Sequence, residues 1–310
     1  MLVIIIFILF ILFLIFITNR NNNNNKIKEY FDESIKEQKT KKPYLWVYWE
    51  NKKGSNIPDY IKLCRQTLLK HASKSFNIVE LNEKNIYDYL PELRDKEKKL
   101  GLDKLIIAHK VDYYRILLLY KYGGLYMDSD IVLLRDPYEI VEKLTDYDFV
   151  GFGCTGEICH NGYSEPSNWC LASRPRGKLM GRVLKHLEQK LENTHNYNPQ
   201  SYHDLGSSPR SYHDLGKFVI WQEIKNLGPD YKYYHYPSNI DGTRDKNGHW
   251  VTDERLFSDK EIDYEFPDKL LFVVLYNSEM NDLSKKTTEE LISGNSNYSK
   301  FIRLSFGLNQ

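Results

Sequence analysis

The sequence predicts an α/β fold in which helices flank a largely parallel sheet. Short apolar stretches of strand length alternate with longer stretches whose apolar residues recur at helical spacing. Hydrophobic residues make up 41% of the chain and aromatic residues 14%, which is enough for a sizeable core and excludes a disordered chain. The 310 residues carry 43 Lys and Arg against 42 Asp and Glu, and the net charge of +1 argues against a nucleic-acid partner.

The alternating elements begin at residue 43. A capping signal and helical periodicity mark one helix, and a longer helix ends at Gly123 and Gly124, which allow a tight turn. Two short strands then lie on either side of an acidic turn. Strands are expected over 44–49, 76–81, 125–127, 131–134, 148–152 and 168–172, and helices over 58–72, 85–90, 105–122 and 178–192.

Residues 2–17 form an unbroken run of Leu, Val, Ile and Phe. As a helix this run would span about 24 Å at ~1.5 Å per residue, short against a hydrocarbon core of ~30 Å, so its length fits a signal peptide or a short anchor. The residues from Ile15 to Arg20 are too bulky for a signal-peptide cleavage site. We therefore expect an uncleaved, single-pass transmembrane signal anchor over 1–18.

Basic residues follow the apolar run and none precedes it. The positive-inside rule would keep the rest of the chain in the cytoplasm, but large domains can override that rule, so the membrane face stays open. Five Asn residues over 21–25 and the Lys- and Glu-rich sequence after them predict a flexible tether over 19–42. One folded domain is expected over 43–310.

Charged residues embedded in apolar sequence are concentrated over 110–137. Asp112 and Arg115 lie three positions apart on the predicted long helix, so they share a face, and a surface ion pair is the ordinary explanation. Two charges among Ile, Leu and Val are costly unless they serve a purpose. Asp128 and Asp130 follow directly after a short strand. Their presence favours a functional role for Asp112 and Arg115 over a surface ion pair.

Asp128 and Asp130 stand two positions apart on a segment expected to be extended, so their carboxylates should point to the same side. Such a pair of hard oxygen ligands suits Mg²⁺ or Mn²⁺ and leaves coordination positions for phosphate oxygens. In an open α/β sheet, ligands bind at strand ends. The sequence therefore predicts a divalent-metal site at this strand end.

The same two carboxylates allow a second enzymatic interpretation. The run from Asp128 to Val132 matches the motif of haloacid-dehalogenase-like phosphatases, which are Mg²⁺-dependent, with Asp128 as the nucleophile and Asp130 as the acid/base. No later apolar strand ends in the paired acidic motif that those phosphatases share. A catalytically inactive relative that binds glycans or nucleotides is a third alternative.

The central segment resembles the signature of the DXD-containing sugar transferases grouped as glycosyltransferase family 32, and of the related capsular polysaccharide synthesis proteins. The likeness extends over about 43–221 and includes the segments 45–50 and 167–169. The matching central positions are Asp112, Arg115, Leu118, Leu119, Tyr122, Gly123, Gly124, Leu125, Tyr126, Asp128 and Asp130.

This resemblance implies a GT-A fold, a Rossmann-like mixed sheet flanked by helices, as the single catalytic domain. It also implies a UDP- or GDP-sugar donor, a glycan or other hydroxyl acceptor, and Mn²⁺ or Mg²⁺ as the cofactor. Related enzymes mostly retain the anomeric configuration, and the same outcome is expected here. The implied activity is that of a membrane-anchored hexosyltransferase in polysaccharide biosynthesis.

Residue roles follow from the resemblance by position. Asp128 and Asp130 would hold the metal on the donor diphosphate, and His249 is a candidate third ligand, although a structural His is at least as common. Asp112 and Arg115 would contact the donor sugar, with Arg115 as a fork for hydroxyls or phosphate. The other expected donor-binding residues are Trp49, which would stack on the nucleobase unless it is a core aromatic, Tyr126, and Asn168 from a segment that resembles the acceptor side.

Overall fold

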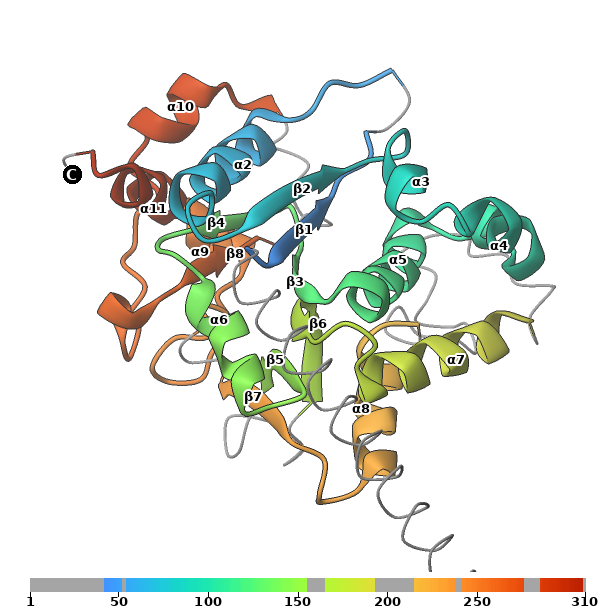
Figure 1. The fold of residues 1–310 in the computed structure, drawn as a ribbon. Coiled ribbons are helices and arrows are strands. Elements are labelled where there is room, and N and C mark those ends of the chain that lie inside the picture. The colour runs from blue at the N-terminus through green and yellow to red at the C-terminus, as the bar shows by residue number, and fades with distance from the viewer. Residues whose placement is uncertain are drawn as a thin grey trace, which may run out of the picture. The chain divides into compact units, whose positions relative to one another are not determined.

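A six-stranded mixed sheet forms the centre of the protein, as Figure 1 shows. The computed structural model describes residues 42–51, 54–154, 165–192, 215–237, 241–275 and 285–308. The strands, in spatial order, are β2 (Asn77–Leu81), β1 (Tyr44–Tyr48), β3 (Gly124–Met127), β6 (Glu165–Ser173), β5 (Phe149–Cys154) and β7 (Tyr233–Pro237). Neighbouring strands are parallel except around β6, which runs antiparallel to both β3 and β5.

Helices cover both faces of this sheet (Figure 1). A second, two-stranded antiparallel sheet pairs β4 (Ile131–Leu133) with β8 (Phe272–Val274). The helices are α2 (Asp59–Ala72), α3 (Ile86–Tyr89), α4 (Leu93–Leu100), α5 (Ile107–Tyr122), α6 (Tyr138–Glu142), α7 (Lys178–Glu192), α8 (Lys217–Leu227), α9 (Asp253–Phe257), α10 (Thr288–Ser293) and α11 (Asn297–Phe306).

Side chains of β1 alternate between two apolar cores, because successive residues of a strand point to opposite faces. Trp46 and Tyr48 pack into the core formed with α5, α7 and α8. Leu45 and Val47 pack into the core on the other face, which includes residues of α2 and α6. Burial on both faces explains why the strand reads as continuously apolar.

The turn between α5 and β3 has the tight geometry expected from its two glycines. Gly123 and Gly124 have φ angles of 67° and 95°, and a Cβ on Gly123 would lie 2.6 Å from the Pro175 ring. The indole nitrogen of Trp46 donates a hydrogen bond to the Gly123 carbonyl at 2.9 Å. This turn directs the chain from the buried helix α5 straight into the centre of the sheet.

The mixed α/β architecture is confirmed, and each strand and helix listed from the sequence is present to within a few residues. The sheet is less parallel than the alternation suggested, because β6 returns between β3 and β5. Helix α4, a mainly charged segment, was not predicted. The anchor expected over 1–18 and almost all of the tether over 19–42 lie outside the described residues, among which no helix is long and apolar enough to cross a membrane.

Candidate active site

Arg115 of α5 lies at the centre of a buried charge cluster. Its Nη2 lies 3.3 Å from Asp112 Oδ1, and its Nη1 lies 3.0 Å from Asp128 Oδ1. The Asp112 and Arg115 side chains are each 6% exposed, so they are not a surface ion pair. The cation also sits over the ring of Tyr126, 4.7 Å from its centroid. One guanidinium therefore connects α5 to the end of β3.

Asn168 of β6 completes the cluster from the other side. Its Nδ2 donates to Asp112 Oδ1 at 2.6 Å, and its backbone carbonyl accepts a hydrogen bond from Arg115 Nη1. Gly216, which precedes α8, approaches so closely that a Cβ there would collide with the Asn168 amide and lie 2.9 Å from Asp112 Oδ2. The predicted donor-binding residue Asn168 is thus brought together with Asp112, Arg115 and Asp128.

Gly216 ends the second copy of a hexapeptide, SYHDLG, that occurs twice in the sequence. Leu215 and Gly216 of this copy are buried, and Leu215 belongs to the core beside α5. The first copy, over 201–206, lies outside the described residues. The end of the second copy therefore forms part of the wall around Asp112.

The two carboxylates beside Arg115 differ in exposure: the Asp112 side chain is 6% exposed and the Asp128 side chain is 30% exposed. Burial raises the pKa of Asp112 to about 7, although the Arg115 charge acts in the opposite direction. Burial also raises the pKa of Asp128, against the lowering effects of the charge and hydrogen bond of Arg115. One guanidinium does not fully offset two such carboxylates. A divalent cation beside Asp128 would supply further positive charge, so the residues present fit the predicted Mn²⁺ or Mg²⁺.

The chain bends at Asp128–Asp130 between β3 and β4. The premise that these residues continue an extended strand is therefore wrong, since β3 ends at Met127. Hydrogen bonds hold all three residues of the bend: the Asp128 amide donates to the Trp169 carbonyl at 2.8 Å, Ser129 Oγ donates to the Tyr48 carbonyl at 2.8 Å, and the Leu275 amide donates to the Asp130 carbonyl at 3.0 Å. The bend is therefore fixed by β6, by β1 and by the end of β8.

His249 does not join a metal site in the structure. Within the described ranges, no three His, Cys, Asp or Glu side chains gather as a metal-binding group, so His249 does not complete one with Asp128 and Asp130. The His249 side chain is 75% exposed, and its Nδ1 lies 3.6 Å from Asp245 Oδ2. Its role as the third ligand remains a prediction with no geometric support.

Tyr126 has a supporting position instead of the expected contact with the donor. Its side chain is fully buried in the core shared with α5, so it offers no surface to a ligand. The ring lies beneath the Arg115 guanidinium and helps to fix its orientation. The expectation that Tyr126 binds the donor directly stays a prediction that this geometry does not support, because the side chain points into the protein from the middle of β3.

Trp49 directly follows β1 and is half-buried. One part of the ring packs against an apolar core, and the residue also lines a hollow of about 160 Å³ at the ends of β1 and β2. Its Nε1 donates to Asn51 Oδ1 at 2.7 Å. The core and ligand interpretations of Trp49 are compatible, because the indole belongs to the core and borders the hollow.

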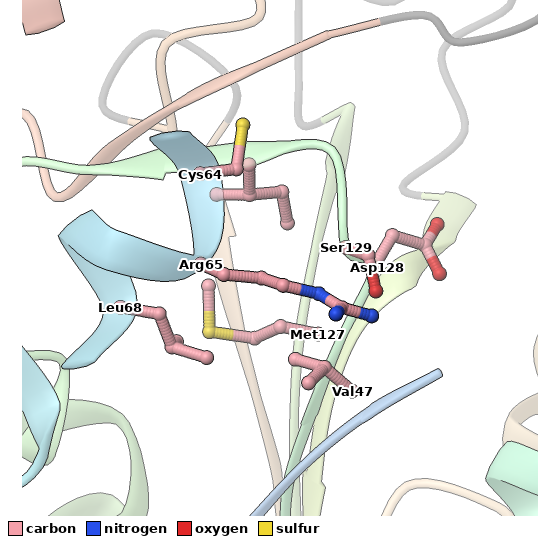
Figure 2. A pocket seen from close by; sticks show the side chains of 8 residues that line it. Val47, Cys64, Arg65, Leu68, Met127, Asp128 and Ser129 are labelled. Atoms are coloured by element: carbon pink, nitrogen blue, oxygen red, sulfur yellow. The ribbon is translucent and has the colours of Figure 1, made fainter. Parts of the chain in front are cut away.

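Arg65 of α2 is a candidate that sequence reasoning missed. It lines the hollow beside Trp49 and also a space of about 10 Å³, the size of one water molecule, shared with Asp128 and Ser129. Figure 2 shows its side chain extending from α2 toward these two residues. Arg65 Nη1 lies 3.2 Å from Glu80 Oε2, and its buried Nε has no hydrogen-bond partner among the described residues.

A signal for Arg65 existed in the sequence. It lies four positions after Ile61 and three before Leu68, and both of these residues are buried, so the arginine occupies the apolar stripe of its own helix. A charge on such a stripe indicates a nearby partner or ligand. The sequence did not reveal that the partner would be the end of β3.

The sequence matches the family model described as capsular polysaccharide synthesis protein over residues 15–207, more than half of the chain. The protein therefore belongs to the capsular polysaccharide synthesis family. The predicted family resemblance is confirmed, and so is the predicted enzyme class, glycosyltransferase. A comparison with curated proteins returns no match.

Three solved structures illustrate how distant the structural likenesses are. The PaToxG glycosyltransferase aligns with a TM-score of 0.40 at 14% identity, over 60% of this chain and 69% of that one. A glycosyltransferase involved in glycosylation of the major capsid of PBCV-1 has a TM-score of 0.37 at 10% identity, over 79% and 100% of the two chains. The catalytic domain of alpha-toxin from Clostridium novyi gives 0.33 at 10% identity, over 86% and 73%. These TM-scores are too low to establish a common fold.

Proposed function

We propose that the protein transfers a sugar from a nucleotide-sugar donor to a hydroxyl of a glycan or another acceptor, with Mn²⁺ or Mg²⁺ and with retention of anomeric configuration. The observation that carries this proposal is the cluster in which the buried Asp112 and Arg115 contact the half-buried Asp128 and Asn168. It joins three separate elements at the end of a central parallel strand. In open α/β sheets such strand ends bind ligands.

The charges of the cluster suit a donor that leaves as an anion. When the bond between the sugar and the diphosphate breaks, negative charge develops on the diphosphate and positive charge on the sugar. A bound divalent metal would neutralise the diphosphate charge. Asp128 and Asp130 are the residues that would hold that metal, and Asp128 is itself oriented by Arg115. The buried carboxylate of Asp112, next to Arg115, would stabilise a cationic sugar bound beside it.

The nucleoside end of the donor would lie over the ends of β1 and β2. Trp49 offers an indole face beside the hollow there, and such a face stacks on any nucleobase. Arg65 extends between this hollow and the bend at Asp128 and Ser129. A guanidinium in that place would bind the ribose or a phosphate oxygen. We extend the proposal to a membrane anchor over 1–18, which would hold the enzyme next to a membrane-bound glycan acceptor.

Thermal-shift measurements on the full-length chain test the proposal. We expect UDP- or GDP-sugars to raise the melting temperature only when Mn²⁺ is present, and we expect Asp130→Ala to abolish that increase. Asp146→Ala, which removes an exposed carboxylate after α6, is the matched control and should behave like the wild type. Stabilisation only by phosphomonoesters, with phosphate release, would contradict the proposal and favour a phosphatase.

A further inference from the structure

The hollow beside Trp49 is lined by charged side chains, which stacking of a nucleobase on the indole does not need. Its lining includes Glu83 and Lys84, which follow β2, together with Asn82. We propose that this hollow selects guanine, so that the donor is a GDP-sugar. This inference rests on the proposed function and narrows its donor class.

The turn after β2 holds Glu83 and Lys84 in fixed places. Asn82 Oδ1 accepts hydrogen bonds from the backbone amides of Lys84 at 2.8 Å and Asn85 at 3.3 Å. In return, Asn85 Oδ1 accepts from the Asn82 amide at 2.8 Å, and Asn85 Nδ2 donates to the Glu80 carbonyl at 2.9 Å. These bonds use the two Asn side chains and fix the backbone that carries Glu83 and Lys84.

Both charged side chains are available to a ligand. Among the described residues, neither the Glu83 carboxylate nor the Lys84 ammonium has a hydrogen bond or ion pair, and both residues are exposed. Arg65, the other cation of the hollow, is paired with Glu80 and does not neutralise Glu83. Within the part of the chain that the structure describes, the rim of the hollow thus presents one acceptor group and one donor group without a protein partner, on consecutive residues.

Guanine matches this pair better than the other common bases. Its N1–H and N2–H₂ groups are adjacent donors that a carboxylate binds with both oxygens, and its neighbouring O6 accepts from an ammonium. Uracil has a single N–H between two carbonyl oxygens, so a carboxylate opposite that edge would face their negative charge. Glu83 and Lys84 side by side therefore correspond to the N1, N2 and O6 edge of a guanine stacked on Trp49.

Isothermal titration of the purified full-length chain with nucleoside diphosphates in Mn²⁺ tests the inference. We expect GDP to bind about tenfold or more tightly than UDP, with IDP, which lacks the N2 amine, in between. Glu83→Gln should lower the affinity for GDP to about that for IDP. It should also raise the affinity for XDP, whose base carries an oxygen at position 2 that the new amide can bind.

Glu142→Gln changes an exposed glutamate at the end of α6 and is the matched control, expected to keep the wild-type order. Equal or tighter binding of UDP by the wild type would overturn the guanine inference and leave the proposed function in place. An unchanged GDP preference in a folded Glu83→Gln variant would also overturn it. Failure of every nucleotide to bind with Mn²⁺ would overturn both.

Discussion

The protein contains two aspartate–arginine pairs, each with a buried aspartate, whose surroundings are opposite. Asp245, in the loop before α9, accepts from Arg255 Nη2 at 2.8 Å and from the backbone amides of Asn247 and His249 at 2.9 and 3.0 Å. Burial alone would raise the pKa of Asp245, but these hydrogen bonds outweigh it and lower the pKa. Its charge is therefore satisfied within one short stretch of chain.

The Asp112–Arg115–Asp128 cluster lacks such local satisfaction. Its members come from α5 and from the bend after β3, with Asn168 of β6 beside them. Burial raises the pKa of both aspartates despite the arginine between them. An ion pair with a buried aspartate is therefore not by itself a functional signal. The functional signal is a cluster in which one arginine does not balance the charge of two carboxylates. This cluster lies at a strand end, where a metal and a diphosphate would bind.

The largest expected effect follows from removing the cation of each pair. Arg115→Met leaves the buried Asp112 carboxylate with only its hydrogen bond from Asn168 and removes the cation beside the partly exposed Asp128 carboxylate. We therefore expect destabilisation of about 3–5 kcal/mol and a loss of transfer of about 100-fold or more. Arg255→Met should cost about 1–3 kcal/mol and leave the transfer rate of the folded protein unchanged. Chemical denaturation and a radiolabelled sugar-transfer assay measure both. Equal losses of sugar transfer in the two variants would contradict the claim that only the Arg115 cluster takes part in catalysis.

Neutralising the carboxylates should separate stability from activity. Asp128→Asn replaces a carboxyl group whose pKa is raised by burial. We therefore expect the free energy of unfolding to change by less than about 1 kcal/mol. The rate of sugar transfer should fall about 100-fold. Asp245→Asn should do the reverse, because it weakens charge-assisted hydrogen bonds in a closed loop. Melting temperatures and rates measured on the same samples provide the check. A large loss of stability in Asp128→Asn would show that this carboxylate is structural.

A smaller effect is expected at Arg65. Arg65→Gln should weaken nucleotide binding about tenfold, since it removes one charge-assisted contact near the bend at Asp128 and Ser129. Lys62→Gln on the same helix changes a side chain that is 51% exposed and serves as the control. Titration calorimetry with the tighter-binding nucleoside diphosphate distinguishes them. An unchanged nucleotide affinity in Arg65→Gln would show that Arg65 pairs with Glu80 and does not contact the nucleotide.

The pH dependence of stability should have opposite signs at the two sites. The lowered pKa of Asp245 gives stability that is present above about pH 4, the unfolded value, and is lost as pH falls through the folded pKa. The pKa of Asp112, raised to about 7, gives stability that is fully present below about pH 4 and is lost as pH rises through 7.

Melting curves from pH 3 to pH 8 therefore compare each variant with the wild type. As pH rises, the stability of Asp112→Asn should increase relative to the wild type. As pH rises through the acidic part of the range, the stability of Asp245→Asn should decrease relative to the wild type. The same sign of change in both variants would mean that the two environments do not differ as described.

Much of this arrangement was predictable from the sequence, because it depends on local patterns. Alternating elements predicted the sheet and its helices, and the spacing of Asp112, Arg115, Asp128 and Asp130 placed the site at the end of β3. Contacts that depend on tertiary packing were not predictable. The antiparallel return of β6, the approach of Arg65 and the burial of Tyr126 are set by which elements pack together.

His249 was predicted as a metal ligand, and its position also depends on tertiary packing that the sequence does not show. Its place in a polar C-terminal segment suggested a ligand, but its loop closes on Asp245 through backbone amides. The bridge between Arg244 and Trp250 closes the same loop. Sequence spacing gives no information on where such a self-contained loop lies relative to the bend at Asp128.

Electron paramagnetic resonance of Mn²⁺ tests the central claim most directly. The signal of free aqueous Mn²⁺ is followed while the full-length chain and GDP or UDP are added. We predict that the wild type removes Mn²⁺ from solution together with the nucleotide, whereas Asp130→Ala and Asp128→Asn do not, and Asp245→Asn behaves like the wild type. Undiminished binding of the Mn²⁺–nucleotide complex by Asp130→Ala and Asp128→Asn would contradict the assignment of the site.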